Sequence, residues 1–188
     1  MLDLRASDYG GGSAWKSRVG PDAVVTGSPK YDGKSYIFFD AISQIAMVPI
    51  NTDGHDMPSA SYSMWAMLPK SIPSGLGWAL SQYPDHGWSR SITLNDARLS
   101  RTAGVSITRG GGWANTLPKP PVGTWFHVAA TWVQGGKACV YLNGKAGLCS
   151  TASNGKHATT KESLCIGGRG PNDSSHNPSI MVKSVLQA

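Results

Sequence analysis

Residues 125–133 (WFHVAATWV) alternate between two kinds of side chain, and this alternation constrains the fold more than any other feature. The even positions are uniformly apolar: Phe126, Val128, Ala130 and Trp132. The odd positions are mixed and include His127 and Thr131. Successive side chains of a strand point to opposite faces. The passage therefore predicts a strand whose even face lies in the core, with His127 as a structural residue on the outer face.

A second strand is expected over residues 137–142, followed by a tight turn at Asn143-Gly144. Asn-Gly is the strongest short hairpin signal, because both residues tolerate positive φ. A regular two-residue turn places Cys139 beside Leu148. A one-residue bulge at Gly144 or Lys145 places Cys139 directly across from Cys149, which is a feasible disulfide geometry. The alternative is a pair of free, half-buried thiols.

The rest of the chain consists of short apolar runs bounded by Gly, Pro, Asp and Ser. These runs cover residues 36–39, 45–48, 61–68, 77–81, 89–94, 104–108, 164–167 and 180–186. No window shows sustained helical periodicity, and many short strands separated by turns are typical of a sandwich or barrel. We therefore predict an all-β chain with little or no helix, forming one domain over residues 1–188.

Charge is distributed unevenly along the chain. Residues 1–100 carry eight Lys or Arg against nine Asp, a balance of −1, whereas residues 101–188 carry nine against two, a balance of +7. A basic half attracts acidic partners. No Lys/Arg run is dense enough to favour nucleic acid, and no apolar run approaches the roughly 20 residues that span a bilayer.

Two motifs mark the hairpin, W-x-HVA-x-T at residues 125–131 and VYLNG at residues 140–144. They resemble the signature of laminin G-like domains, which belong to the concanavalin A-like lectin/glucanase superfamily. Further matching pieces follow in the expected order: Leu4-x-Ala6-x-Asp8 with Trp15, Phe38-Phe39-Asp40, Ser63-Met64-Trp65, Ile166-Gly167-Gly168 and residues 181–185. The resemblance implies a two-sheet antiparallel jelly-roll sandwich. It also implies binding of glycans or proteins through loops at one rim, often with calcium, and hydrolysis in a minority of members.

The sequence argues against hydrolysis. Glycosidases use two carboxylates that flank the scissile bond, and the glucanases of this superfamily carry two Glu around an Asp on one strand. This chain has a single glutamate, Glu162, beside Lys161. No Gly-x-Ser-x-Gly elbow and no close Cys-x-x-Cys pair is present. We expect a protein that is not an enzyme.

Candidate ligand-binding residues lie in two glycine-containing stretches. Three glycines precede Trp113 and separate it from Arg109, so a turn there is expected to present the indole together with Asn115. Trp88 is a second loop aromatic, and Arg90 adds positive charge nearby. Half-exposed aromatic residues favour sugar and protein recognition. The alternative is that each indole covers the core and each arginine is simply solvated.

Calcium binding would require oxygen ligands from the loops. The candidates are Asp85, Asp96 and Asp173. Capping of a turn is the ordinary role of an aspartate at such positions.

We conclude from the sequence that this is a recognition module, which binds a glycan or a protein surface through rim loops, and the basic half favours an acidic partner. The alternative is a structural subunit that docks into a larger assembly by its basic half. An extracellular or lumenal location is favoured if the chain is a processed or excised domain.

Overall fold

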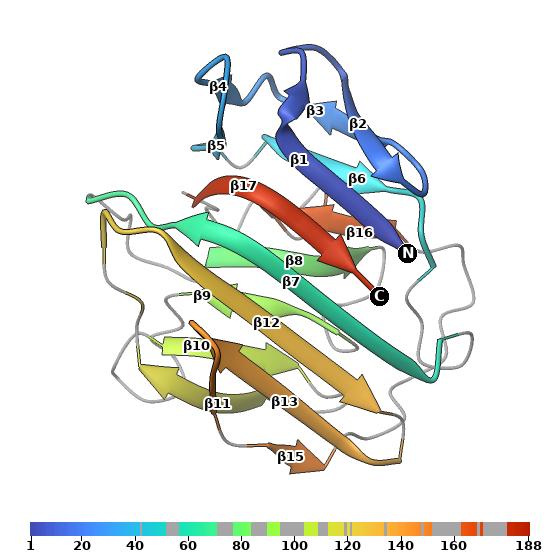
Figure 1. Ribbon diagram of the computed structural model, residues 1–188, viewed down its shortest axis with the longest axis vertical. Helices are drawn as coiled ribbons and strands as arrows, with labels where there is room; N and C mark the ends of the chain where they lie inside the picture. The colour runs from blue at the N-terminus through green and yellow to red at the C-terminus, as the bar shows by residue number, and fades with distance from the viewer. Residues whose placement is uncertain are drawn as a thin grey trace.

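The computed structural model describes residues 1–41, 43–51, 57–70, 77–83, 90–94, 104–108, 113–118, 120, 122–133, 135–147, 149–151, 163–168, 170 and 180–188. Within these ranges every regular element is a strand, and all strand pairs are antiparallel. The strands form two packed layers (Figure 1). The predicted all-β sandwich is confirmed. No helix that could cross a membrane occurs in the described part of the chain.

The front layer is centred on β7 (Ser59–Met67), which lies between β12 (Phe126–Val133) and β17 (Ile180–Gln187) (Figure 1). β12 continues into β13 (Lys137–Leu142), which also pairs with β14 (Lys145–Ala146) and β15 (Ser150–Thr151). On the other side of β7, the C-terminal half of β17 pairs with β1 (Leu2–Tyr9), and β1 pairs with β2 (Ala14–Val19). The N-terminal half of β17 pairs with β5 (Ile37–Phe39), and β5 pairs with β4 (Lys30–Tyr31).

Among the described residues, seven strands follow one another across the back layer. They are β3 (Ala23–Thr26), β6 (Ile45–Val48), β16 (Ser163–Ile166), β8 (Gly77–Tyr83), β9 (Ile92–Leu94), β10 (Gly104–Thr108) and β11 (Trp113–Pro118). β2 pairs with β3, so hydrogen bonding continues from one layer into the other. The two layers are therefore linked by hydrogen bonds along this edge as well as by the core between them.

The core lies between the two layers and is built by side-chain alternation. The four even positions of β12 are buried, as predicted: Phe126, Val128, Ala130 and Trp132. The even positions of β7 are buried as well, and the rings of Tyr62 and Trp132 pack with centroids 5.3 Å apart. Each large side chain buried in this way contributes roughly 1.5–3 kcal/mol to folding.

One glycine permits a close approach of the two layers. Gly167 has a φ of +81°, and a Cβ added there would lie 2.6 Å from the Cγ of Phe39. A side chain at this position would displace the Phe39 ring and would strain the backbone. The glycine of the Ile-Gly-Gly motif is therefore explained by packing against the core.

The hairpin after β13 has both a regular turn and a register shift. Asn143 and Gly144 adopt positive φ, and Leu142 pairs with Lys145, as a two-residue turn requires. The pairing then shifts by one residue, since Ala138 pairs with Ser150. A disulfide joins Cys139 and Cys149, with an S–S distance of 2.06 Å. The irregularity that aligns the cysteines lies beyond the turn and not at Gly144 or Lys145.

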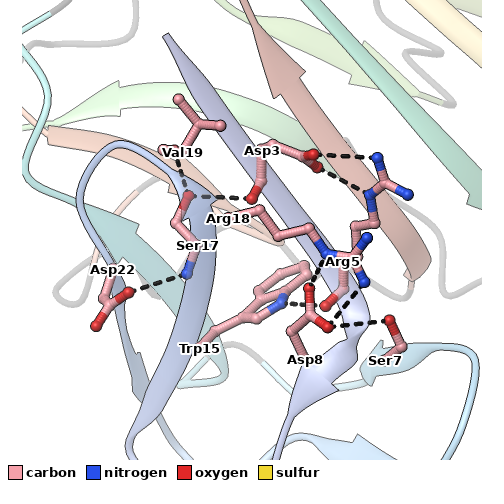
Figure 2. A network of polar contacts seen from close by, with 9 residues as sticks. All are labelled: Asp3, Arg5, Ser7, Asp8, Trp15, Ser17, Arg18, Val19 and Asp22. Carbon is pink, nitrogen blue, oxygen red and sulfur yellow. Dashed lines mark hydrogen bonds and ion pairs between the residues drawn. The ribbon is translucent and has the colours of Figure 1, made fainter.

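The β1–β2 pair is held by polar contacts that Figure 2 shows at close range. Trp15 lies in β2, is buried, and donates its indole N–H to the Arg5 carbonyl at 2.7 Å. Arg18 reaches from β2 to Asp8 on β1, with 2.5 Å between Nε and Oδ2. The hydroxyl of Ser17 donates to the Asp3 carbonyl at 3.0 Å. These contacts anchor the N-terminal strands and neutralise their charged side chains.

Candidate functional site

The candidate binding residues predicted from the sequence do not come together in the part of the chain that the structure describes. Trp88, Arg109 and the candidate calcium ligands Asp85, Asp96 and Asp173 lie outside the described residues. The backbones of Trp113 and Asn115 belong to strand β11 and pair with Thr108 and Ser106 of β10, rather than lying in a loop. Arg90 is only 4% exposed, so it is neither a solvated residue nor an open positive charge for a surface ligand.

The outer face of the front layer carries an exposed aromatic residue, Trp65. It points away from the core at an odd position of β7, and 45% of it is exposed. Trp65 pairs across the strands with His127 of β12, and their ring centroids lie 5.4 Å apart with planes inclined by 54°. The imidazole thus supports one side of the indole, while much of the indole remains open to solvent.

Three further residues extend this group on the same side of the sandwich. Trp125, immediately before β12, packs against Tyr36 with ring centroids 5.9 Å apart. The ammonium of Lys183 lies 4.2 Å from the centroid of the Trp125 ring, a cation–π contact. We call Tyr36, Trp65, Trp125, His127 and Lys183 the aromatic patch.

Local structure explains how Tyr36 and Lys183 reach the patch. Asp32 accepts hydrogen bonds from the backbone N–H groups of Lys34, Ser35 and Tyr36, which closes the turn leading into β5. On β17 the pairing is irregular: Val182 pairs with Ala66 and Ser184 with Trp65, so Lys183 is an inserted residue. Such bulges re-aim side chains. Lys183 reaches across β7 to Trp125 on the far side.

Small hydroxyl residues adjoin the patch on the same face. Ser61 and Ser63 lie at odd positions of β7, and Thr131 lies at an odd position of β12, directly paired with Ser61. All three are half-buried. We call them the hydroxyl strip. Together with Trp65, this strip offers an apolar ring face beside hydroxyl groups that both donate and accept hydrogen bonds.

Two titratable groups set the electrostatics of the patch. Burial lowers the pKa of His127, which favours the neutral imidazole. Lys183 has no ion-pair partner among the residues that the structure describes. By contrast, four cations of the N-terminal half are neutralised by aspartates: Arg5 by Asp3, Lys16 by Asp22, Arg18 by Asp8 and Lys30 by Asp40. Within the described part of the chain, the positive charge of the patch is therefore not compensated by a carboxylate.

The described carboxylates have structural partners. Four form the ion pairs above, and Asp32 closes a turn. Partial desolvation opposes ionisation of Asp32, but hydrogen bonds from the Ser35 side chain and from backbone N–H groups hold its pKa well below the usual value. No group of three His, Cys, Asp or Glu suited to a metal ion occurs within the described ranges.

Sequence reasoning did not identify the aromatic patch. In the alternating segment SYSMWAM, Trp65 shares the solvent-facing side of the strand with Ser61 and Ser63. A large indole at such a position was the sequence signal that could have identified the patch. His127 was recognised as an outer-face residue, but its partner was not. The bulge that directs Lys183 depends on the pairing of β17 with β7 and has no local signature.

Comparison with known proteins supports the fold. No curated protein sequence matches the chain. Similar solved structures include the Trypanosoma rangeli sialidase in complex with sialic acid, at 15% identity and a TM-score of 0.71, covering 99% of this chain and 30% of that chain. A mutant of that sialidase displaying trans-sialidase activity gives 16% identity and a TM-score of 0.72, covering 100% of this chain and 30% of that chain.

A third similar structure is the botulinum neurotoxin serotype D binding domain, at 11% identity and a TM-score of 0.67, covering 100% of this chain and 47% of that one. This chain thus spans less than half of each of these proteins, and at such identities the likeness concerns the fold alone. A family model described as the concanavalin A-like lectin/glucanases superfamily matches residues 45–180, which is most of the chain. The chain therefore belongs to the concanavalin A-like lectin/glucanases superfamily.

Proposed function

We propose that this protein is a non-catalytic recognition module that binds a glycan on the aromatic patch. The observation that carries the proposal is the indole of Trp65, which is 45% exposed and stands on the outer sheet face against His127. Large aromatic side chains are normally buried, so an exposed and laterally supported ring is a rigid surface for stacking.

The chemistry around Trp65 suits a sugar. A pyranose ring has an apolar face of C–H groups and an edge of hydroxyls, so it needs a flat apolar surface with hydrogen-bonding groups beside it. Trp65 offers the first, and Ser61, Ser63 and Thr131 offer the second. Because these hydroxyls lie on paired strands, their spacing is fixed before a ligand arrives, which limits the entropy lost on binding.

Docking of a protein at the same place is less well supported. A stable protein interface buries about 800 Å² on each partner and has an apolar centre. On this face the small residues Ser63 and Ala129 lie between larger ones: Leu186, which is 43% exposed, pairs with Ser63, and Tyr141 pairs with Ala129. The larger apolar groups are thus separated by small side chains and do not form one apolar centre, so the alternative of a structural subunit predicts contacts elsewhere on the molecule.

Three further observations support a recognition role. The superfamily includes lectins, as its name says. The aromatic patch contains no carboxylate, whereas glycoside hydrolysis ordinarily requires two. The disulfide between Cys139 and Cys149 is typical of proteins in oxidising compartments, where complex glycans are exposed.

The test is a glycan array probed with the wild-type protein, Trp65→Ala and Val133→Ala. Val133 is an exposed apolar residue at the other end of the same face of β12, so it controls for loss of exposed apolar surface. We expect binding to a defined group of glycans that Val133→Ala retains and Trp65→Ala loses. Absence of any glycan binding by the wild-type protein would contradict the proposal.

A further inference from the structure

We infer that Lys183 makes the aromatic patch selective for glycans that carry an anionic substituent, a carboxylate or a sulfate ester. The inference rests on the proposed glycan-binding function and adds the class of ligand. It depends on three features of Lys183: its place in the β17 bulge, the fixed position of its ammonium, and the absence of a counter-ion in the described part of the chain.

The bulge brings Lys183 to the patch. In β17, Val182 and Ser184 pair with adjacent residues of β7, Ala66 and Trp65, which leaves Lys183 as the inserted residue between them. Its neighbour Ser184 pairs with the exposed Trp65, so Lys183 emerges next to the proposed stacking surface. A regular register would not leave an extra residue at this point.

The contact with Trp125 holds the ammonium in place. Nζ lies 4.2 Å from the ring centroid of Trp125, and Trp125 is itself braced by Tyr36. An ordinary surface lysine loses substantial side-chain entropy when it binds a ligand. The cation–π contact restrains Lys183 beforehand, so that less entropy is lost when an anion binds.

The charge of Lys183 is available for an external partner. Arg5 on β1 pairs with Ser184, which in turn pairs with Trp65. The guanidinium of Arg5 already forms an ion pair with Asp3. Lys183 has no such pair among the described residues. A sugar stacked on Trp65 with an anionic substituent directed toward Lys183 would form a charge-assisted hydrogen bond, which is stronger than a neutral one.

An ammonium group acts as a point charge and does not select between anion shapes. Carboxylated and sulfated sugars therefore share the chemistry that Lys183 recognises. The chain as a whole adds a favourable field, since its net charge is +6.

The experiment compares matched glycans by titration: a neutral glycan, its carboxylated form with the carboxyl-reduced control, and its sulfated form with the desulfated control. The variants are Lys183→Met, Lys183→Arg and Lys137→Met. Lys137 is exposed at the start of β13, at the opposite end of the face from the patch, so its substitution removes the same charge at a distance. Thermal melting verifies that each variant is folded.

We expect Lys183→Met to weaken binding of at least one acidic class by about tenfold and to leave the neutral glycan unchanged. Lys183→Arg should retain most of the preference, and Lys137→Met should retain all of it. If Lys183→Met and Lys137→Met lose affinity for the acidic glycan equally, the preference comes from the net charge of the protein and not from the position of Lys183. That result would overturn the inference. A preference that survives Lys183→Met while Trp65→Ala abolishes binding would overturn the inference and leave the proposed function standing. Absence of all glycan binding would overturn both.

Discussion

His127 and Trp65 face each other across paired strands, with ring centroids 5.4 Å apart. The backbone of His127 is fixed at the same time by Asn143, because its N–H donates to Asn143 Oδ1 at 2.8 Å and its carbonyl accepts from the Asn143 N–H at 2.8 Å. The two family motifs, W-x-HVA-x-T and VYLNG, therefore meet at the base of the aromatic patch. His127 is a positioning residue for Trp65.

The lowered pKa of His127 predicts a pH dependence of stability. Burial keeps the folded-state pKa below the unfolded value of 6.5, so the unfolded chain takes up the proton first as the pH falls. The free energy of unfolding should be fully retained above about pH 6.5 and should decrease below it. Urea denaturation at about pH 7.5 and about pH 5.5 measures this for the wild type and His127→Gln. An equal decrease in both proteins would rule out His127 as the source.

Asp32→Ala should loosen the turn that delivers Tyr36 to the patch. The substitution removes the acceptor of three backbone hydrogen bonds and should cost about 1 kcal/mol of folding free energy. Because Asp32 has a lowered pKa, the wild-type advantage should persist at neutral pH and vanish as the carboxylate is protonated at strongly acid pH. Denaturant titration at neutral and acid pH measures both effects. A wild-type advantage that is unchanged at acid pH would contradict the role assigned to the carboxylate.

Loss of the Cys139–Cys149 disulfide should destabilise the hairpin that supports His127. The bond closes a loop with a sequence separation of 10, for which the chain-entropy model gives about 3 kcal/mol. The double variant Cys139→Ala/Cys149→Ala should therefore melt at a lower temperature than the wild type. Mild reduction of the wild type should reproduce the shift, whereas reduction of the double variant should have no effect. A variant as stable as the oxidised protein would show that the bond does not constrain the chain.

Cys165 should remain unreactive while the protein is folded. It is buried in β16, and burial raises the pKa of its thiol to about 12, so almost no thiolate exists at neutral pH. Alkylation with iodoacetamide followed by mass spectrometry should label this residue only after denaturant is added. Rapid labelling under native conditions would contradict the packing of the back layer.

Much of the fold was predictable because local alternation determines which side chains are buried. The even positions of β12 and the bounds of β10 and β13 follow from the sequence. Strand β2 was missed because most of its side chains face solvent, Val19 included, and only Trp15 is buried, against the ring of Tyr9.

The candidate site was less predictable, because it is assembled from contacts between distant segments. Trp65, His127 and Lys183 come from three different strands, and their proximity depends on register and on one bulge. The sequence instead favoured Trp88 and Trp113, on the basis of neighbouring glycines. Trp113 proved to lie in strand β11, since the chain there pairs with β10.

The most direct test of a binding site on the sheet face is calorimetric titration of one array-selected glycan into the wild-type protein, Trp65→Ala, Trp88→Ala and Trp113→Ala. We predict that Trp65→Ala weakens the affinity by about tenfold or more, as expected for the loss of a stacked ring, and that the other two variants bind as the wild type does. Wild-type affinity in Trp65→Ala, together with loss of binding in Trp88→Ala or Trp113→Ala, would contradict the account and return the site to the rim loops.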